Sequence, residues 1–587
     1  MILSRATLRW PRAMSAGAAV ALVVGTAAAG CFTVDAGNAP PRDSFYFPTG
    51  LAISPGGQAL FVANSDFDLR YNGGTVQALA LANEGGLRER ALCIQGALSK
   101  FSPLPGESEE AAASFRSSCE ALLQAGGARP LPCGNLGKNP NPVLYPGPCA
   151  PLGVEPFITR SAIIGAFASG AVLVHPPEGQ GEGARLFIPV RGDPSVSFFD
   201  IEDDRSCAAE PGACDRPVRL DCGADGEGRC GADFRVGENP YESPRALRLP
   251  LEPVGLAAGA TGNAIVTAHQ TQTAASLILN SWTSKPVLTY VLSGLADGPT
   301  EVAALPTPGL AAACGDAISY QPGFLMTYRA APVLDLLRYE ADAGSAPPRG
   351  YLTRASRLNI SVNTNGTDSR GIAVDDSERR TCEVACDAQW QACEPGCSGE
   401  RLSCLAACTE IPVRFFVANR SPASLLVGQV RTVPVTFEGA PGESDRVCGP
   451  QRFTSAYEIM ELQDSVALSY GASRVSLGHI IGKDGTPQLR VFAVAFDSRF
   501  IFSYDPAARR VDAIIRTGRG PHSIAFDTFA PTGEAGSGSQ RRAHSFMYVA
   551  HFTDSYIGVV DLDARRPESF GSMVLTLGNP QSPQESQ

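Results

Sequence analysis

Lysine is scarce in this chain, which has 48 basic and 59 acidic residues and a formal net charge of −11 at pH 7. Only four of the basic residues are lysines, and the acidic balance argues against nucleic acid as a partner. Sequences of the form Cys-x-x-Cys are missing, which excludes a zinc ribbon and a covalently attached haem. No glycine motif for binding phosphate or a dinucleotide stands out, so no cofactor is predicted. After residue 31 no apolar run reaches the ~18 residues that span a bilayer.

The first thirty residues have the pattern of an export signal. Three arginines precede an apolar stretch at residues 16–27, which is too short for a mature membrane span. We therefore predict that residues 1–30 are a signal peptide that is removed.

The end of this signal resembles the lipobox of bacterial lipoproteins, because small residues at 28–30 lead directly into Cys31. The resemblance implies acylation of Cys31, a tether at residues 31–44 and membrane attachment through the acyl anchor. Phe32 stands where Asp would signal retention in the inner membrane, so the resemblance favours the outer membrane. Ala28 stands where the lipobox favours Leu, which leaves ordinary secretory cleavage as an alternative.

The cysteine content fits an exported protein. Removal of Cys31 from the total of 17 leaves sixteen, an even number that indicates disulfides. Most of them fall in three predicted insertions, at residues 91–150, 203–240 and 381–410. The second insertion is rich in Asp and Gly but lacks the spacing of an EF-hand, so a disulfide-pinned loop is favoured over a calcium site.

The third insertion contains six cysteines in a symmetric array about Pro395, with gaps of four and seven residues. These gaps place the cysteines of each arm on one helical face, and Pro395 breaks a continuous helix. We therefore predict a helical hairpin with nested disulfides, among fifteen possible pairings: Cys382–Cys408, Cys386–Cys404 and Cys393–Cys397. A metal cluster would need free thiols in an oxidising compartment, so no metal site is predicted. By elimination, Cys314 pairs with Cys448.

Segments at the two ends of the chain share the same order of features. Residues 48–81 and 521–562 each contain a proline, a short apolar strand, a turn, a second strand (ALFVAN or FMYVAH), a polar turn and a third strand. Short strands between Gly, Asp and Asn turns predict antiparallel sheet. Five more degenerate copies give a predicted total of seven, with six or eight as alternatives: residues 185–201, 253–279, 323–340, 370–376 with 414–430, and 489–506.

The order Pro-x-Gly-(Ile/Leu)-Ala, (Phe/Tyr)-Val-Ala-Asn and Val-(Ile/Val)-Asp resembles the YVTN-type β-propeller repeat of bacterial envelope proteins. This resemblance implies an all-β fold: a β-propeller of about seven four-stranded blades over residues 45–578, followed by a disordered tail at 579–587. A β-sandwich or β-helix made of the same strands is the alternative that strand spacing leaves open.

Histidines provide the candidate ligand-binding residues. His269 and His551 stand where Asn64 and Asn419 end the second strand of other copies, and could converge on one rim. The alternative is that all four residues satisfy backbone groups of the following turn. His522, in GPHSIAF, resembles the start of blades in lactonase-type propellers, which hydrolyse sugar lactones.

No catalytic residue is predicted, because the matching Arg, Glu and His set of those enzymes cannot be located residue by residue. The favoured function is a non-catalytic binding or interaction scaffold on the cell surface or facing the periplasm, with a protein or glycan partner in the envelope. The alternative is a hydrolase or lyase of lactonase type that acts on a sugar lactone or glycan.

Overall fold

The computed structural model describes residues 37–82, 85–124, 133–176, 183–205, 217–309, 323–342, 349–361, 368–392, 398–438, 451–529 and 542–580. The predicted signal peptide lies outside these residues, as do residues 581–587 of the predicted tail and Cys31, Cys314, Cys393, Cys397 and Cys448. None of the helices in the described ranges has the length and apolar character needed to cross a membrane.

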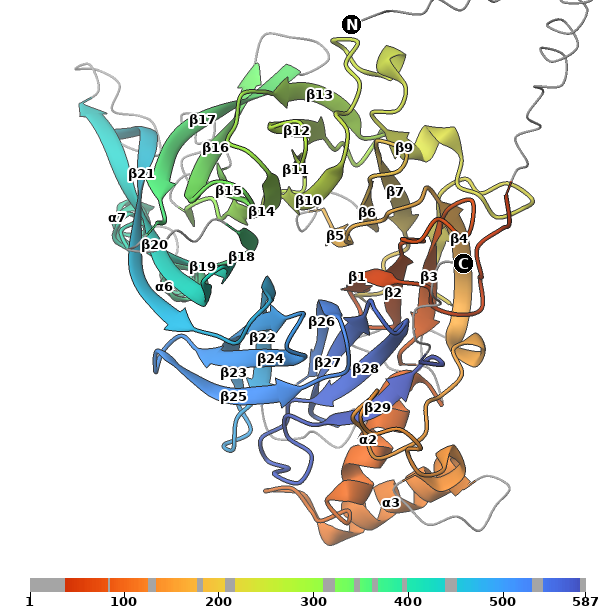
Figure 1. Ribbon diagram of the computed structural model, residues 1–587. Helices are drawn as coiled ribbons and strands as arrows, with labels where there is room; N and C mark the ends of the chain where they lie inside the picture. Colours follow the sequence, from red (N-terminus) through yellow and green to blue (C-terminus); the bar gives the residue numbers. More distant parts are fainter. Residues whose placement is uncertain are drawn as a thin grey trace, which may run out of the picture. The chain divides into compact units, whose positions relative to one another are not determined.

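The strands form seven consecutive antiparallel sheets, each made from one continuous part of the chain (Figure 1). The first three blades consist of β1 Pro48–Ile53, β2 Ala59–Asn64, β3 Gly74–Ala80 and β4 Ile158–Ile164; β5 Val172–Val174, β6 Ala184–Val190, β7 Ser195–Ile201 and β8 Leu220–Asp221, with β9 Arg235–Val236 also on β7; and β10 Pro253–Ala258, β11 Ala264–His269, β12 Ala274–Leu279 and β13 Val287–Leu292.

The other four blades have the same order. They consist of β14 Pro299–Leu305, β15 Gly323–Tyr328, β16 Val333–Asp342 and β17 Arg349–Asn359; β18 Ser369–Asp375, β19 Val413–Arg420, β20 Ala423–Glu438 and β21 Gln451–Ala467; β22 Ala472–Ile481, β23 Pro487–Ala495, β24 Phe500–Asp505 and β25 Arg510–Arg516; and β26 Pro521–Phe529, β27 His544–His551, β28 Tyr556–Asp561 and β29 Met573–Leu577. Each of the seven predicted copies lies in a different blade, so the prediction of a seven-bladed β-propeller is confirmed.

The ring is held together by apolar side chains between neighbouring blades. Seven hydrophobic clusters are found among the described residues, one at each junction between blades. The second strand of a blade is buried on both faces, as in β2 and β27. A single blade leaves both faces open to water, so the blades are stable only when they stack against each other.

The ring closes between blade 7 and blade 1 without exchange of a strand. The Leu51 amide donates to Ser523 Oγ at 3.2 Å, and the Phe47 amide donates to Ser555 Oγ at 3.1 Å. Farther out, Leu152 forms a parallel bridge with Leu577. Short-range bonds between the two terminal blades therefore replace the shared strand that could close such a ring.

The insertion after β3 contains two helices that the sequence analysis did not predict, α2 Leu87–Leu98 and α3 Glu109–Gln124. Its cysteines form the disulfides Cys93–Cys119 and Cys133–Cys149. The Pro- and Gly-rich sequence around these helices obscures their apolar periodicity. Helix α2 packs on the core between blades 7 and 1. Short 3₁₀ turns follow at η1 Gly134–Leu136 and η2 Glu155–Phe157. In the acidic insertion, Cys222 is bonded to Cys230, and two more 3₁₀ turns lie in it and at its end, η3 Ala232–Phe234 and η4 Pro240–Glu242.

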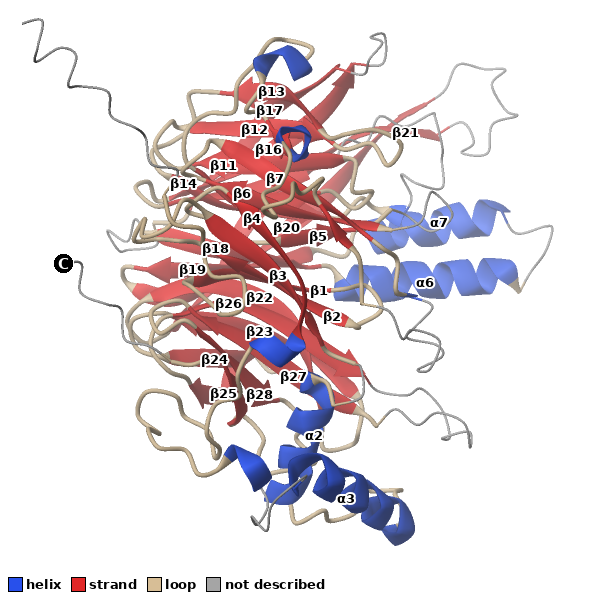
Figure 2. Ribbon diagram, turned by 90° about the vertical axis from the view of Figure 1, so that its right-hand side faces the viewer, coloured by secondary structure: helices blue, strands red, loops and turns tan. Residues whose placement is uncertain are grey.

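The insertion after β18 is a hairpin of helices α6 Ser377–Gln391 and α7 Ser398–Thr409, which stand out from one face of the ring (Figure 2). Disulfides join Cys382 to Cys408 and Cys386 to Cys404, with Cα–Cα distances of 5.6 and 5.8 Å. Arg401 of α7 pairs with Asp387 of α6 at 2.8 Å. The hairpin thus has covalent and ionic links between its arms.

Candidate functional site

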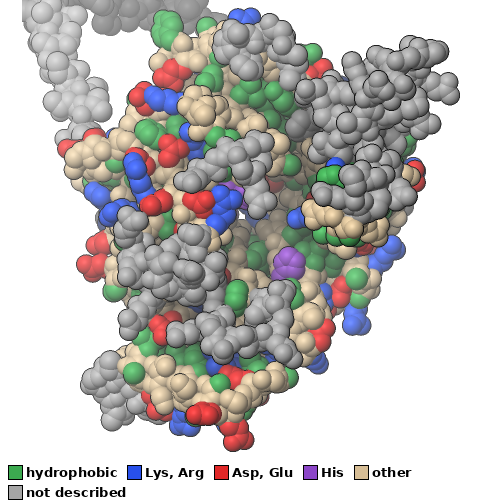
Figure 3. Space-filling model, turned by 180° about the vertical axis from the view of Figure 1, so that it is seen from behind, with side chains coloured by type: hydrophobic (Ala, Val, Ile, Leu, Met, Phe, Trp, Pro, Cys, Tyr) green, Lys and Arg blue, Asp and Glu red, His purple; other side chains and the backbone are tan. Residues whose placement is uncertain are grey.

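A cavity of about 280 Å³ lies at one end of the channel that the blades surround. We call it the front cavity, because the first strands of the blades begin there and the turns between second and third strands surround it. Seventeen residues line it: Thr49, Ser65, Phe67, Phe167, Ala168, Ser169, Arg191, Val254, Thr300, Glu301, Arg370, Arg420, Ser473, Arg474, Phe496, His522 and Phe552. A second cavity of about 190 Å³ shares Glu301, Arg474 and His522 with it. The opposite face of the molecule is hollowed near its centre (Figure 3).

One position of the Pro-x-Gly motif binds a blade to the next at three junctions. Thr49 Oγ1 donates to the carbonyl of Ala168 at 2.9 Å, and Ser169 Oγ donates to the carbonyl of Val254 at 2.8 Å. Thr300 makes the same bond, to the carbonyl of Ser369 at 2.9 Å. The x position therefore links neighbouring blades at Thr49, Ser169 and Thr300, whereas Ser473, at the same position in blade 6, donates to the Val494 carbonyl of its own blade at 3.2 Å.

His522 occupies this same position in blade 7. Its Nδ1 lies 3.0 Å from the Thr49 carbonyl oxygen, across the closure of the ring. A carbonyl can only accept, so Nδ1 carries the proton and Nε2 is left as an acceptor. Burial and the positive charge of Arg474 lower the pKa of His522 to about 3, which keeps the ring neutral near pH 7.

The next position of the motif is glycine where first strands approach each other closely. A Cβ on Gly50 would lie 2.6 Å from the Gly170 carbonyl carbon, and one on Gly371 would lie 2.6 Å from the Arg474 Cα. Glu301 and Arg474 stand at the equivalent position in blades 4 and 6. The sequence analysis missed both residues. The signal that could have found them is that each replaces the glycine of the Pro-x-Gly motif that other copies carry.

Glu301 and Arg474 form an ion pair inside the channel. Arg474 Nη1 donates to Glu301 Oε2, and Nη2 donates to the carbonyl of Ser169 at 2.9 Å. Arg474 of blade 6 therefore bonds to blades 2 and 4. Burial raises the pKa of Glu301, and the charge of Arg474 opposes that rise.

Three further arginines line the front cavity, each with a carboxylate partner. Arg191 pairs with Glu252 at 3.0 Å, Arg370 with Asp368 at 2.8 Å and Arg420 with Asp497 at 2.5 Å. The three side chains keep between 24% and 29% of their surface exposed, so they are not fully enclosed by these pairs.

Phenylalanines also line the front cavity. The Phe67 ring packs edge-on against Phe552, with centroids 5.1 Å apart, and against Phe167 at 5.7 Å. Phe496 contacts Phe552 at 6.2 Å. Phe67 is 49% exposed, which is unusual for so large an apolar side chain in a cluster. The front cavity is thus lined by both arginines and aromatic rings.

The structure does not bring His269 to this cavity. His269 is fully buried at the end of β11, where Nε2 lies 2.7 Å from Ser276 Oγ and Nδ1 lies 3.3 Å from the Leu251 carbonyl. Asn64 has a comparable role at the end of β2, where its amide donates to Thr75 Oγ1 at 3.0 Å. At the end of β19, Asn419 donates to the Pro422 carbonyl at 2.9 Å. All three side chains thus bond to their own surroundings, and only Asn419 satisfies a backbone group of the following turn, as the structural alternative had it.

His551 is also buried away from the cavity. Its ring stacks on Tyr556 with centroids 4.0 Å apart, and Nε2 accepts a hydrogen bond from the Gly518 amide at 3.2 Å. Burial lowers the pKa of His551 to about 3. Of the three candidate histidines, only His522 lines the front cavity.

Replacement of His269 by Asn, the residue that ends the second strand in blades 1 and 5, is expected to preserve the fold and to change the pH dependence of stability. Burial lowers the pKa of His269 to about 4, against an ordinary value of 6.5. The unfolded chain therefore binds more protons between these values, and the contribution of His269 to stability is lost as pH falls below 6.5. In urea titrations from pH 7 to 4, the free energy of unfolding should fall less in the variant than in the wild type. The difference in slope should be up to about 1.4 kcal/mol per pH unit. An unchanged slope would contradict this assignment, and exposed His175→Asn is the control.

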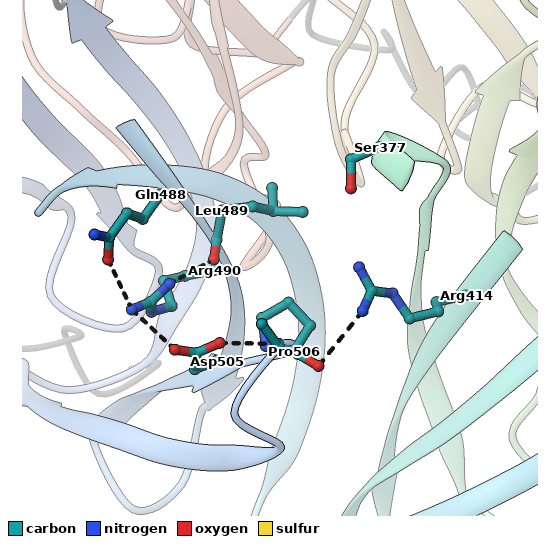
Figure 4. A pocket seen from close by; sticks show the side chains of 8 residues that line it. Ser377, Arg414, Gln488, Leu489, Arg490, Asp505 and Pro506 are labelled. Carbon is teal, nitrogen blue, oxygen red and sulfur yellow. Dashed lines mark hydrogen bonds and ion pairs between the residues drawn. The ribbon is translucent and has the colours of Figure 1, made fainter. Parts of the chain in front are cut away.

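Another cavity, of about 330 Å³, lies between blades 5 and 6 near the start of α6 (Figure 4). Arg490 pairs there with Asp505 at 3.1 Å and with Asp512 at 2.6 Å. Arg414 donates to the Pro506 carbonyl at 3.4 Å and pairs with Asp375 at 2.7 Å. Carboxylates thus surround both arginines, so this cavity is a weaker candidate for a ligand site.

The sulfurs of Cys382, Cys386 and Cys408 lie within 4.8 Å of one another, a spacing that a metal ion could also produce. All three belong to the two disulfides of the α6–α7 hairpin, which lie on successive helical turns. A disulfide sulfur is not a thiolate, so this cluster offers no metal ligands in its oxidised state.

These features define the class of protein as a seven-bladed β-propeller with a cavity in its central channel. No protein-family model and no curated protein matches the sequence. Among solved structures, the chain is similar to a candidate 6-phosphogluconolactonase from Bacteroides uniformis, at 10% identity and a TM-score of 0.38, over 81% of this chain and 86% of the other. It is also similar to a periplasmic gluconolactonase from Pseudomonas aeruginosa, at 14% identity and a TM-score of 0.30, over 76% and 73%. These likenesses are too remote to bear on activity.

Proposed function

We propose that this protein is a non-catalytic binding scaffold of the cell envelope, anchored through acylated Cys31, and that the front cavity is its ligand site. The observation that supports this most is the state of His522. Its Nδ1 is committed to the Thr49 carbonyl, and its low pKa makes it a poor proton acceptor at neutral pH. The side chains around the cavity thus provide contacts for a ligand, and the histidine among them is not poised to accept a proton near pH 7.

A variant that fills the front cavity tests the site. Ser473 lines the cavity, and Ser473→Trp would place an indole within it. A thermal-shift screen with a panel of sugars, organic acids and peptides should find compounds that raise the melting temperature of the wild type and not of Ser473→Trp. Ala507→Trp, at the cavity between blades 5 and 6, is the matched control. Equal shifts in Ser473→Trp, or no shift with any compound, would exclude the front cavity as the site.

A hydrolase or lyase of lactonase type is the second candidate, because Glu301, Arg474 and His522 line one cavity from three different blades. Thr or Ser at the position of His522 makes the blade-to-blade bond elsewhere, so His522→Thr should preserve the fold. If the protein hydrolyses glucono-δ-lactone and this folded variant does not, the catalytic function is favoured. The scaffold proposal expects no turnover above the spontaneous rate in either protein.

The proposed anchor has its own test. Cys31→Ser removes the thiol that would be acylated, so the variant is expected to move from the membrane fraction to the soluble fraction of the envelope. Immunoblots of the separated fractions measure this distribution. A variant that stays in the membrane fraction would show that another feature attaches the protein.

A further inference from the structure

The charges around the front cavity are arranged unevenly. Among the described residues that line it, four are arginines and Glu301 alone is acidic. The carboxylates that pair with Arg191, Arg370 and Arg420 do not belong to the lining. The guanidinium groups are therefore nearer to an occupant than most of their counter-charges, so the field inside the cavity favours an anion.

The arginines also have N–H donors that their ion pairs do not use. A guanidinium carries five N–H donors, and each of these ion pairs uses only one or two of them. The clearest case is Arg191, which donates from Nη2 to Glu252 Oε1 at 3.0 Å and still keeps 29% of its side chain exposed. An anionic group in the cavity can therefore pair with the exposed part of this guanidinium.

Aromatic rings also line the cavity, where Phe67, Phe167, Phe496 and Phe552 form a chain of ring contacts. An occupant that satisfies both kinds of side chain has anionic groups toward the arginines and a flat or apolar face toward the rings. The volume of about 280 Å³ restricts it to a compact molecule.

We propose that the front cavity binds a compact organic anion with at least two carboxylate or phosphate groups, held by Arg191, Arg420 and Arg474. The inference rests on the proposed function, which makes this cavity the ligand site, and adds the chemical class of the ligand. Arg191 belongs to blade 2, Arg420 to blade 5 and Arg474 to blade 6, so a ligand with two or more anionic groups can pair with arginines of more than one blade.

Isothermal titration of the purified protein at low salt tests the charge requirement. Isophthalate combines two carboxylates with a flat ring, and isophthalamide is its neutral analogue of the same shape. We expect isophthalate to bind, isophthalamide to bind at least about tenfold more weakly, and added NaCl to weaken isophthalate alone. Citrate and fructose 1,6-bisphosphate distinguish a carboxylate from a phosphate ligand.

Two substitutions with opposite expected effects locate the site. Arg191→Gln should weaken isophthalate binding about tenfold or more, whereas Glu252→Gln removes the competing carboxylate and should strengthen it. Arg116→Gln, at an exposed ion pair on α3, is the control and should leave the affinity unchanged. Binding that ignores Arg191 and Glu252 would overturn the proposal.

The outcomes separate this inference from the proposed function. If isophthalamide or a sugar binds in a manner that Ser473→Trp abolishes, and no anion binds up to about 10 mM, the anion is excluded and the cavity remains the ligand site. If neither charged nor neutral probes bind in a manner that Ser473→Trp abolishes, both proposals fail.

Discussion

Replacement of Arg88 by Met is expected to lower the free energy of unfolding by about 3–5 kcal/mol. Arg88 of α2 and Asp527 of β26 form a bidentate pair at 2.6 and 3.0 Å, with side chains only 7% and 4% exposed. The same guanidinium donates to the Gly57 carbonyl at 2.6 Å. Its loss would leave the Asp527 carboxylate buried without its main counter-charge, at the junction where the ring closes.

The pKa of Asp527 supports this expectation. Burial alone would raise it, yet the charge of Arg88, with a smaller contribution from His544, holds it below its usual range. A carboxyl with a lowered pKa stabilises the fold above its unfolded value, and that stabilisation is lost as pH falls toward the folded value. Arg88→Met should therefore be destabilised more at pH 7 than at pH 3.

Urea denaturation at 25 °C measures the effect. Arg116→Met, at the exposed pair with Glu120, should change stability by less than about 1 kcal/mol. The double variant Arg88→Met, Asp527→Leu should recover part of the loss, because it removes the unpaired charge. A single variant as stable as the wild type would show that the α2 insertion does not support the ring closure.

Replacement of His551 by Ala is expected to cost about 3 kcal/mol of stability. The change removes the ring that stacks on Tyr556 and leaves the buried Gly518 amide without its acceptor. A residue with a ligand-binding role would instead alter binding or turnover and leave stability nearly unchanged. The prediction thus distinguishes the two roles that the sequence left open for His551.

Thermal and urea unfolding measure the loss, and the exposed His175→Ala is the control. His551→Asn should retain more stability than His551→Ala, because Asn at this repeat position can form hydrogen bonds inside the blade, as Asn64 does with Thr75 Oγ1 and Asn419 with the Pro422 carbonyl. A stable His551→Ala that loses binding of the isophthalate probe would refute the structural assignment.

The histidines show where pattern alone was insufficient. Asn64, His269, Asn419 and His551 share a place in the repeat, and the sequence could not tell whether they face a common rim or fill their own turns. The pairing of these residues with the first strand, as in Pro253 with His269 and Pro521 with His551, places them inside the blades. A side chain enclosed by its own blade cannot converge with its equivalents.

The sequence by itself determined the modular plan of this protein. Strand periodicity and the recurring Pro-x-Gly motif are local properties, so the seven copies could be read from the chain, as could the cysteine spacing of the α6–α7 hairpin. Only the tertiary structure decided which residues meet at the axis. Glu301 and Arg474 are 173 positions apart, and Arg191, directly after β6, is likewise distant in the chain from Arg420, the last residue of β19. Closure of the ring makes them neighbours, because it depends on packing between blades that no local pattern records.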